Sequence, residues 1–499
     1  MRSAARPGSG WWAGAEAALL ATVALGAARF LVGVSTPPEL LADAVIALFP
    51  PAVFSATLDV LGVIAKPLLT FALLAGQTAL GALVGAAATG LLSLIDEPVD
   101  FSRASGLAAL LGLVGWLAAL FVLLPVGGEG FFGLNSPPGP ILTMFSYLGV
   151  AAVYAASLAW FLAHPERVPR PANRRGVVLA LGAGVAGSVL AGFGLRSFGS
   201  LAGAARAARL PSPITPIPGF YVVYKNLFPV DVDLTRWSLT VEGSERTNHF
   251  NLADLRAMPV TNVVSTLTCI SNPIGGDLIG TARWTGVRLG DLLQLVGLSS
   301  STTNVIFRAW DDYADSIPID RALHPTTLLA YEMDGEPLRP EHGAPLRLLV
   351  PGLYGIKNVK WITNISQTDH GFVGYWPARG WTDTANVQTQ SQIDVPADRS
   401  VHPLGPIATA GIAFAGDRGI SRVEVSVDGG KTWRAAQLTR PLTSLTWTVW
   451  SFSWRPSAPG QYRLFVRAVD GSGAAQIAIP ADPIPDGATG YDSITVRVV

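Results

Sequence analysis

The sequence predicts an α-helical membrane region followed by an α+β domain and a C-terminal all-β, immunoglobulin-like sandwich. Residues 12 to about 197 consist largely of Ala, Leu, Gly and Val, whereas the remainder has the composition of an ordinary soluble protein. Short helices and strands alternate irregularly from 210 to 395, and period-2 strands at regular spacing follow Val395. The expected parts are a transmembrane anchor region, a linker, the α+β domain and the sandwich, over 1–200, 201–218, 219–396 and 397–499.

Five apolar stretches are long enough to cross a bilayer, because a membrane-spanning helix needs roughly 20 residues. They run near Trp12–Val34, Pro67–Ile95, Ala104–Pro125, Ile141–Ala163 and Gly176–Phe193. The apolar segment Glu39–Ala65 is interrupted by Pro50 and Pro51, which indicates an amphipathic or re-entrant element.

The distribution of arginine predicts the orientation of these spans. The N-terminus and the loop His164–Arg175 are rich in arginine, whereas the loop Gly127–Pro140 contains neither lysine nor arginine. With five spans and both arginine-rich ends inside, the chain after residue 200 lies on the extracytoplasmic face of the cell membrane. The pair Arg174-Arg175 is either a twin-arginine export signal, which moves proteins already folded around a cofactor, or a simple positive-inside anchor.

Charge and histidine content restrict the function of the chain. The 35 basic and 35 acidic residues balance, so no basic surface indicates a nucleic-acid partner. Haem in a helical bundle usually needs paired histidines, and His164 is the only histidine in the first 200 residues. The spans therefore serve as an anchor or as a docking surface for another electron carrier.

Local patterns predict the elements of the soluble part. Asn251–Ala257 is expected to be a helix with Asn251 as its N-cap, and Leu289–Val296 a second helix. Strands are expected in the α+β domain at Phe220–Val223, Trp237–Val241, Val263–Thr268, Val305–Trp310 and Pro345–Val350. Those of the sandwich are expected at Gly411–Phe414, Arg422–Val427, Thr446–Trp454, Gln461–Val469 and Ser493–Val498.

Cys269 is the only cysteine of the chain, so it cannot belong to an intrachain disulfide. It is therefore a small buried apolar residue, a nucleophile or a ligand. Polar and turn-forming residues follow it directly, from Ser271 to Gly276, which indicates a shaped loop after the strand Val263–Thr268. Such loops on rigid scaffolds commonly carry binding sites. A cysteine hydrolase stays open, although no histidine lies near Cys269 in the sequence.

The densest polar region apart from Cys269 runs from Glu341 to Trp361. His342 and Arg347 flank the start of a buried strand, and a glycine turn then presents Asn358 and the cations Lys357 and Lys360. These charge-assisted donors suit an anionic, phosphate-bearing ligand, and a solvated surface turn is the alternative. No common metal, Walker or dinucleotide motif is present.

Several ordered motifs resemble the sulfite oxidase family of molybdenum enzymes, over about residues 218–499. They are Phe220–Val223 with Asp231–Val241, the loop of Cys269 ending at Ala282–Val287, Asp312–Ser316, Leu329–Met333, His342–Trp361 and Val425–Trp433. Any one of them alone is weak, but their order and spacing together are specific.

This resemblance implies a molybdenum–molybdopterin cofactor whose metal is bound by the thiolate of Cys269. The positions matching the family's pterin-phosphate contacts are His342, Arg347, Gly355, Ile356, Lys357 and Lys360. Those matching neighbouring cofactor contacts are Val222, Val223, Asn226 and Asp311. The resemblance also implies a catalytic role for Tyr313, a homodimer formed through the sandwich, and a separate electron carrier that is a haem protein or is quinone-linked.

The chain departs from the sulfite-oxidising members at the arginines that bind the substrate anion. The stretch after Cys269, Ile270–Ile274, contains no cation, and only Arg418 is a candidate of that kind. We therefore favour a membrane-anchored molybdopterin oxidoreductase that transfers an oxygen atom to or from a small substrate. The alternatives are a sulfite dehydrogenase and a cofactor-free binding protein on the same scaffold.

Overall fold

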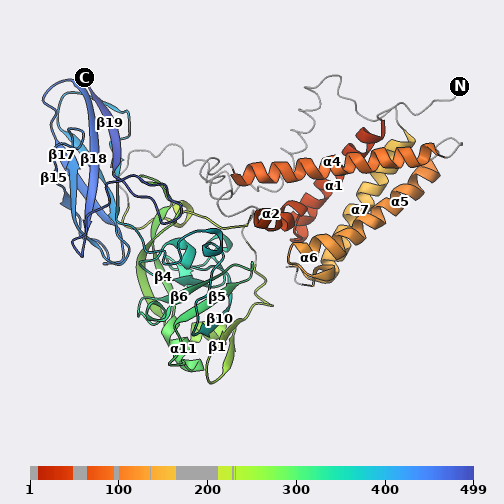
Figure 1. The fold of residues 1–499 in the computed structure, drawn as a ribbon, viewed down its shortest axis with the longest axis horizontal. Helices are drawn as coiled ribbons and strands as arrows, with labels where there is room; N and C mark the ends of the chain where they lie inside the picture. The colour runs from red at the N-terminus through yellow and green to blue at the C-terminus, as the bar shows by residue number, and fades with distance from the viewer. Residues whose placement is uncertain are drawn as a thin grey trace. The chain divides into compact units, whose positions relative to one another are not determined.

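The computed structural model describes residues 9–48, 65–94, 101–134, 136, 138–164, 212–226, 230 and 232–499. The chain divides into a helical unit, Met1–Ala202 with Asn226–Phe228, and a second unit, Gly203–Lys225 with Pro229–Val499 (Figure 1). Each unit has its own hydrophobic core.

The helical unit contains apolar helices of membrane-spanning length. Its elements are α1 (Ser9–Val32), α2 (Pro37–Leu48), α4 (Ala65–Ser93), α5 (Phe101–Ala118), the π-helix η2 (Ala119–Leu123), α6 (Leu124–Val126), η3 (Phe131–Gly133) and α7 (Pro140–Ala163). Four candidate spans coincide with the first four predicted stretches, and they run over Gly10–Val32, Leu68–Ser93, Phe101–Val126 and Pro140–Ala163. The fifth predicted span, Gly176–Phe193, lies outside the described residues, as does the end of the predicted re-entrant segment after Leu48.

Glycines allow α1 and α4 to pack closely. A Cβ atom on Gly14 would overlap the carbonyl oxygen of Gly81, and one on Gly85 would overlap that of Gly10. Small residues at helix interfaces are typical of membrane bundles, where backbone proximity rather than the hydrophobic effect drives association. The glycine content of this region therefore has a packing role.

One mixed sheet and one antiparallel sheet form the α+β part of the second unit, drawn from green to teal in Figure 1. The first has the strand order β2-β1-β10-β5-β6, and its strands are β1 (Leu239–Glu242), β2 (Thr247–Phe250), β5 (Asn304–Ala309), β6 (Ala314–Pro318) and β10 (Ile362–Thr368). The second has the order β3-β4-β7-β8 with β9 also paired to β7, and its strands are β3 (Thr261–Thr268), β4 (Ile279–Arg288), β7 (Leu328–Met333), β8 (Glu336–Pro337) and β9 (Arg347–Leu349).

Short helices complete this part of the unit. They are η5 (Ile217–Gly219), α10 (Leu252–Ala257), α11 (Leu289–Val296), α12 (Ile319–Ala322), η6 (Pro340–His342), η7 (Gly355–Lys357) and η8 (Pro377–Arg379). Asn251 accepts a hydrogen bond from the Asp254 amide in a capping box, so the predicted N-cap is confirmed. The predicted helix Leu289–Val296 is confirmed by α11, in which Leu289, Leu292 and Leu293 are buried.

The predicted strand Phe220–Val223 is wrong, because residues 221–224 form no regular element. The Phe220 ring packs edge-on against the rings of Trp284 and His342, while Val222 and Val223 are exposed. The apolar and aromatic residues of this segment therefore line a cavity and do not form a strand.

The C-terminal part is a two-sheet β-sandwich, blue in Figure 1. One sheet has the order β11-β13-β17-β16, with β11 (Gln390–Val395), β13 (Ile407–Phe414), β16 (Gln437–Leu438) and β17 (Thr448–Trp454). The other has the order β12-β19-β18-β14-β15, with β12 (Val401–His402), β14 (Ile420–Ser426), β15 (Arg434–Ala435), β18 (Gly460–Asp470) and β19 (Asp492–Val498). All five predicted sandwich strands correspond to β13, β14, β17, β18 and β19.

A loop of the sandwich holds the strand that leads to Cys269. The Thr443 hydroxyl donates to the carbonyl of Val264, and the Thr266 amide donates to the carbonyl of Leu445. The amide of Trp447 also donates to the Thr266 hydroxyl. The outer edge of β3 is thus covered by the sandwich rather than left open.

Gly286 provides a test of the second sheet. A Cβ atom at this position of β4 would overlap the carbonyl oxygen of Leu329 on β7, so Gly286→Ala should destabilise the protein by roughly 1–3 kcal/mol. Gly371→Ala is the matched control, because nothing lies within 4 Å of its added Cβ. Thermal unfolding of the purified variants measures both, and equal melting temperatures would contradict the packing described for β4 and β7.

Candidate functional site

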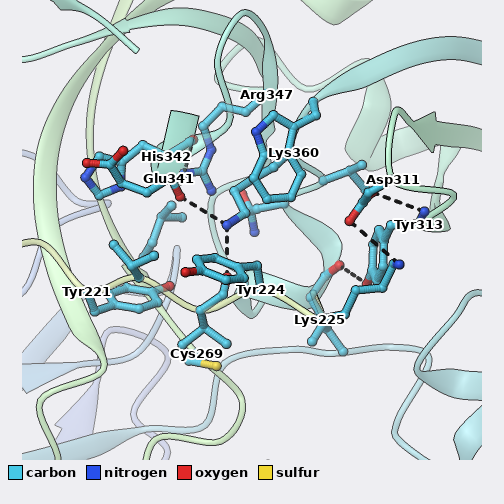
Figure 2. Close-up of a pocket in the computed structure, with 18 of the residues that line it drawn as sticks. Tyr221, Tyr224, Lys225, Cys269, Asp311, Tyr313, Glu341, His342, Arg347 and Lys360 are labelled. Atoms are coloured by element: carbon cyan, nitrogen blue, oxygen red, sulfur yellow. Dashed lines mark hydrogen bonds and ion pairs between the residues drawn. The ribbon is translucent and has the colours of Figure 1, made fainter. Parts of the chain in front are cut away.

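A cavity of about 100 Å³ in the second unit gathers side chains from distant parts of the chain (Figure 2). Its lining residues come from 220–225, 267–269, 311–313, 341–361 and 376. The second sheet supplies two sides of it, since Cys269 directly follows β3 and Arg347 begins β9. The site is therefore built on strand ends, where side chains are held in place by the sheet.

Cys269 lines the cavity, and hydrogen bonds fix its backbone. The amide of Cys269 donates to the carbonyl of Leu278 at 2.9 Å, and its carbonyl accepts from the amide of Asn272 at 3.1 Å. The Sγ atom lies 3.0 Å from the Ser271 hydroxyl. Burial raises the pKa of the Cys269 thiol, whereas the hydrogen bond from Ser271 lowers it. A thiol in this setting needs a further positive partner to ionise fully at neutral pH, and a metal ion is such a partner.

Arg347 is a buried cation with few partners. Its side chain packs over the Trp284 ring with 4.9 Å between the guanidinium carbon and the ring centroid. Its Nη1 donates to the carbonyl of His342 at 3.1 Å, and its Nε has no hydrogen-bond partner. Among the described residues no carboxylate forms an ion pair with it. Burial lowers the pKa of Arg347 to about 10, so the group is still charged at neutral pH.

His342 and Lys360 lie near Arg347. Burial, helped by the charges of Arg347 and Lys360, lowers the pKa of His342 to about 4, so its imidazole is neutral at pH 7. The ammonium of Lys360 donates to the carbonyls of Val223 at 3.0 Å and Glu341 at 3.2 Å. It also lies 4.5 Å from the centroid of the Trp361 ring. This end of the cavity is consequently cationic.

The turn Gly355–Lys357 closes another side. A Cβ atom on Gly355 would lie 3.2 Å from the hydroxyl of Tyr221 and 3.8 Å from the Cα of Cys269, so only a glycine fits without tightening the cavity. The Lys357 ammonium points away from the cavity and donates to Asp315 and Asp383, each at 2.7 Å. Lys357 therefore anchors the turn.

Tyr313 reaches the same turn from β6. Its hydroxyl donates to the carbonyl of Ile356 at 2.7 Å and lies 3.3 Å from the carboxylate of Asp315. Burial and the charges of Asp315 and Asp311 raise the pKa of Tyr313 well above its ordinary value. The hydroxyl is therefore a proton-bearing donor at neutral pH rather than a base.

The structure brings most of the predicted site residues together. Those that line the cavity are Val222, Val223, Cys269, Asp311, Tyr313, His342, Arg347, Gly355, Ile356 and Lys360. Those that do not are Asn226, Lys357 and Arg418. The Arg418 guanidinium is held by Asp470 at 2.8 Å and by the carbonyl of Val387 at 3.0 Å.

Sequence reasoning missed several lining residues, most of them aromatic or charged. They are Phe220, Tyr221, Tyr224, Lys225, Leu267, Glu341, Val359, Trp361 and Trp376. The aromatic cluster immediately before Lys225 is a usable signal for a site, although its composition also predicts a strand. The partners of Lys357 are 42 and 26 residues away in the chain, so no local pattern could reveal them.

Two family models match the second unit. The oxidoreductase molybdopterin binding domain matches residues 226–376, and the Mo-co oxidoreductase dimerisation domain matches residues 382–484. Arabidopsis thaliana sulfite oxidase is 31% identical over 285 residues, which cover 47% of this chain and 72% of that protein. The chain belongs to the sulfite oxidase family of molybdopterin-dependent oxidoreductases.

Other proteins are similar to this chain over different lengths. Mitochondrial sulfite oxidase of Mus musculus is 33% identical over 309 residues, covering 52% of this chain and 56% of that protein. The chain thus spans about half the length of the mammalian relatives it matches. The oxidoreductase YuiH of Bacillus subtilis is 31% identical over 185 residues, or 91% of its length.

A solved structure shares the fold of the second unit. The sulfane dehydrogenase SoxCD of Paracoccus pantotrophus aligns with a TM-score of 0.52 at 24% identity, covering 58% of this chain and 82% of that one. The shared α+β and sandwich arrangement is what this likeness shows.

The residues of the cavity fit the molybdenum–pterin cofactor that the family implies. An anionic phosphate would neutralise the buried guanidinium of Arg347 and could accept from its unpartnered Nε. The Cys269 sulfur is available to a soft metal ion, and Gly355 leaves the space that a Cβ atom would narrow. The thiol of Cys269 therefore suits the metal of the cofactor, and the guanidinium of Arg347 suits its phosphate.

Lys357 provides a test of the site's internal support. Lys357→Met should cost roughly 3–5 kcal/mol of stability, because it leaves the carboxylate of Asp315, 1% exposed, without a counter-charge. Asp383→Asn removes the other partner, which is 61% exposed, and should change stability by no more than about 0.5 kcal/mol. Chemical denaturation measures both, and equal losses would show that the buried pair does not hold the turn.

Proposed function

We propose that the protein is a membrane-anchored molybdenum–pterin oxidoreductase that carries out two-electron oxygen-atom transfer on a small extracytoplasmic substrate. The observation that carries this proposal is one cavity lined by both the thiol of Cys269 and the guanidinium of Arg347, which has no carboxylate partner among the described residues. When bound, the molybdenum centre supplies the two-electron chemistry, and the protein supplies orientation and electrostatics.

In this proposal the cavity residues have distinct roles. Cys269 is the protein ligand of the metal. Arg347, Lys360 and neutral His342 hold the phosphate, and Gly355 with Ile356 forms the adjoining wall. Val222 and Val223 border the cofactor from the segment before Lys225.

Tyr313 is the proposed catalytic donor. Because its pKa is raised, its hydroxyl keeps its proton at neutral pH, and it donates that proton to a substrate oxygen by exchanging it for the carbonyl of Ile356. The carbonyl of Ile356 and the carboxylate of Asp315 hold that hydroxyl in position. Asn226, Lys357 and Arg418 stay predictions as site residues, since they do not line the cavity.

The remaining features of the proposal concern the whole molecule. The four candidate spans support a multi-pass anchor, and the arginine-rich loops favour an extracytoplasmic catalytic domain. The match to a dimerisation domain supports a homodimer formed through a sandwich of immunoglobulin type over 397–499. Electrons would pass to or from a separate haem protein or quinone-linked carrier.

Sulfite is the second candidate substrate, because several similar proteins are named sulfite oxidases. Its oxidation to sulfate consumes water and releases two protons and two electrons, which an acceptor such as ferricyanide can take up. Against it, the Cys269 loop places no cation beside the thiol, and Arg418 does not line the cavity.

Metal analysis of the purified protein tests the proposed function. We expect about one molybdenum and one pterin per chain, and loss of the molybdenum in Cys269→Ser, because an alcohol is a poor ligand for this metal at neutral pH. Ser301→Ala, an exposed loop position, is the control and should keep full molybdenum. Full molybdenum in Cys269→Ser would contradict the ligand assignment, and none in the unmodified protein would favour a cofactor-free binding protein.

A further inference from the structure

The Cys269 sulfur has a hydroxyl neighbour that does not itself line the cavity. The Ser271 Oγ lies 3.0 Å from the Cys269 Sγ, and either atom could donate the proton while the sulfur is a thiol. A thiolate bound to a metal carries no proton, so in the holoprotein the hydroxyl has to be the donor. The contact therefore has one direction once a metal is bound.

We propose that Ser271 is a positioning residue for the metal ligand: its hydroxyl donates a hydrogen bond to the Cys269 thiolate and thereby raises the reduction potential of the bound metal. This inference rests on the proposed function, because it concerns the same ligand. Ser271 acts on the metal through the sulfur and needs no contact with the substrate.

The backbone of the loop places Ser271 beside the sulfur. The Asn272 amide donates to the carbonyl of Cys269 at 3.1 Å, so Ser271 is the third residue of a four-residue turn. The side-chain oxygen of Asn272 accepts from the amide of Leu278 at 2.9 Å, and the Cys269 amide donates to the carbonyl of Leu278 at 2.9 Å. A Cβ atom on Gly276 would overlap that Asn272 oxygen, so the loop is closely packed. The turn that carries the hydroxyl is therefore fixed by the protein itself.

A turn serine commonly uses its hydroxyl to cap its own turn, and that use is closed to Ser271. The usual partner is the amide two residues further on, and that residue is Pro273, which has no amide hydrogen. Within the part of the chain that the structure describes, the Cys269 sulfur is the one hydrogen-bond partner of this hydroxyl. The hydroxyl is consequently directed to the proposed ligand rather than to the backbone.

The low exposure of the sulfur makes this hydrogen bond effective. Cys269 is 6% exposed, so water competes little for its sulfur, and a hydrogen bond to a negative atom is stronger in such a place. Adding electrons to a metal bound by this sulfur increases the negative charge that the sulfur carries. The hydroxyl therefore stabilises the reduced metal more than the oxidised one, and this difference raises the reduction potential.

Removing the hydroxyl and then restoring it tests the inference on the molybdenum-loaded protein. We expect Ser271→Ala to keep its molybdenum and to shift the equilibrium between reduced and oxidised metal roughly three- to tenfold toward the oxidised form. Ser271→Thr keeps a hydroxyl and should return the equilibrium to that of the unmodified protein. Redox titration with mediators, followed by electron paramagnetic resonance, measures these potentials.

The sulfur-to-molybdenum charge-transfer absorption provides a second readout. Loss of the hydrogen bond raises the energy of the sulfur electrons, so the band of Ser271→Ala should lie at longer wavelength than that of the unmodified protein or of Ser271→Thr. Thr268→Val is the matched control, because the Thr268 hydroxyl contacts the carbonyls of Cys269 and Leu278, at 3.5 and 3.3 Å, and not the sulfur. Both readouts should stay unchanged in this control.

A fully loaded Ser271→Ala with unchanged potential and absorption would overturn the role of Ser271, and so would an equal shift in Thr268→Val. Should Ser271→Ala be purified without molybdenum, a crystal structure of the unmodified holoprotein decides. A distance between the Ser271 Oγ and the Cys269 Sγ beyond about 4 Å would contradict the hydrogen bond, and a shorter one would support it. Unmodified protein without molybdenum would instead overturn the proposed function, and the inference with it.

Discussion

The burial of the Arg347 guanidinium is the constraint on which the site depends. A charged group removed from water costs several kcal/mol unless an opposite charge or a set of hydrogen bonds offsets that cost. Here the Trp284 ring and one backbone carbonyl are the contacts that the structure shows, while the Nε atom has no partner. A cation held in this way indicates an anionic ligand, and the neighbouring Lys360 and neutral His342 agree with a phosphate.

The same sheet that buries this cation also sets the position of the proposed metal ligand. β9 begins at Arg347 and pairs with β7, whereas β3 ends one residue before Cys269 and pairs with β4, which pairs with β7. Because the sandwich covers the free edge of β3, the thiol and the guanidinium are held on one rigid scaffold. Preorganisation of this kind lets one group with a metal at one end and a phosphate at the other bind without rearrangement of the strands.

Much of the fold could be predicted from the sequence, because hydrophobic periodicity and capping are local signals. The helix Leu289–Val296, the Asn251 cap, the sandwich strands and the polar stretch from Glu341 to Trp361 are examples. The prediction of a strand at Phe220–Val223 is wrong, because a run of aromatic and β-branched residues that lines a cavity has the same composition as a strand. The ion-pair partners of Lys357 and Lys225 could not be predicted, since Asp315 and Asp311 are brought to them only by tertiary structure.

In the proposed holoenzyme, the metal of one cofactor lies at Cys269 and its phosphate lies at Arg347. Anomalous diffraction from crystals of the purified protein, recorded on both sides of the molybdenum absorption edge, tests it most directly. We expect a molybdenum peak within bonding distance of the Cys269 sulfur, with continuous electron density extending toward Arg347. A molybdenum peak elsewhere, or no molybdenum peak beside Cys269, would contradict it.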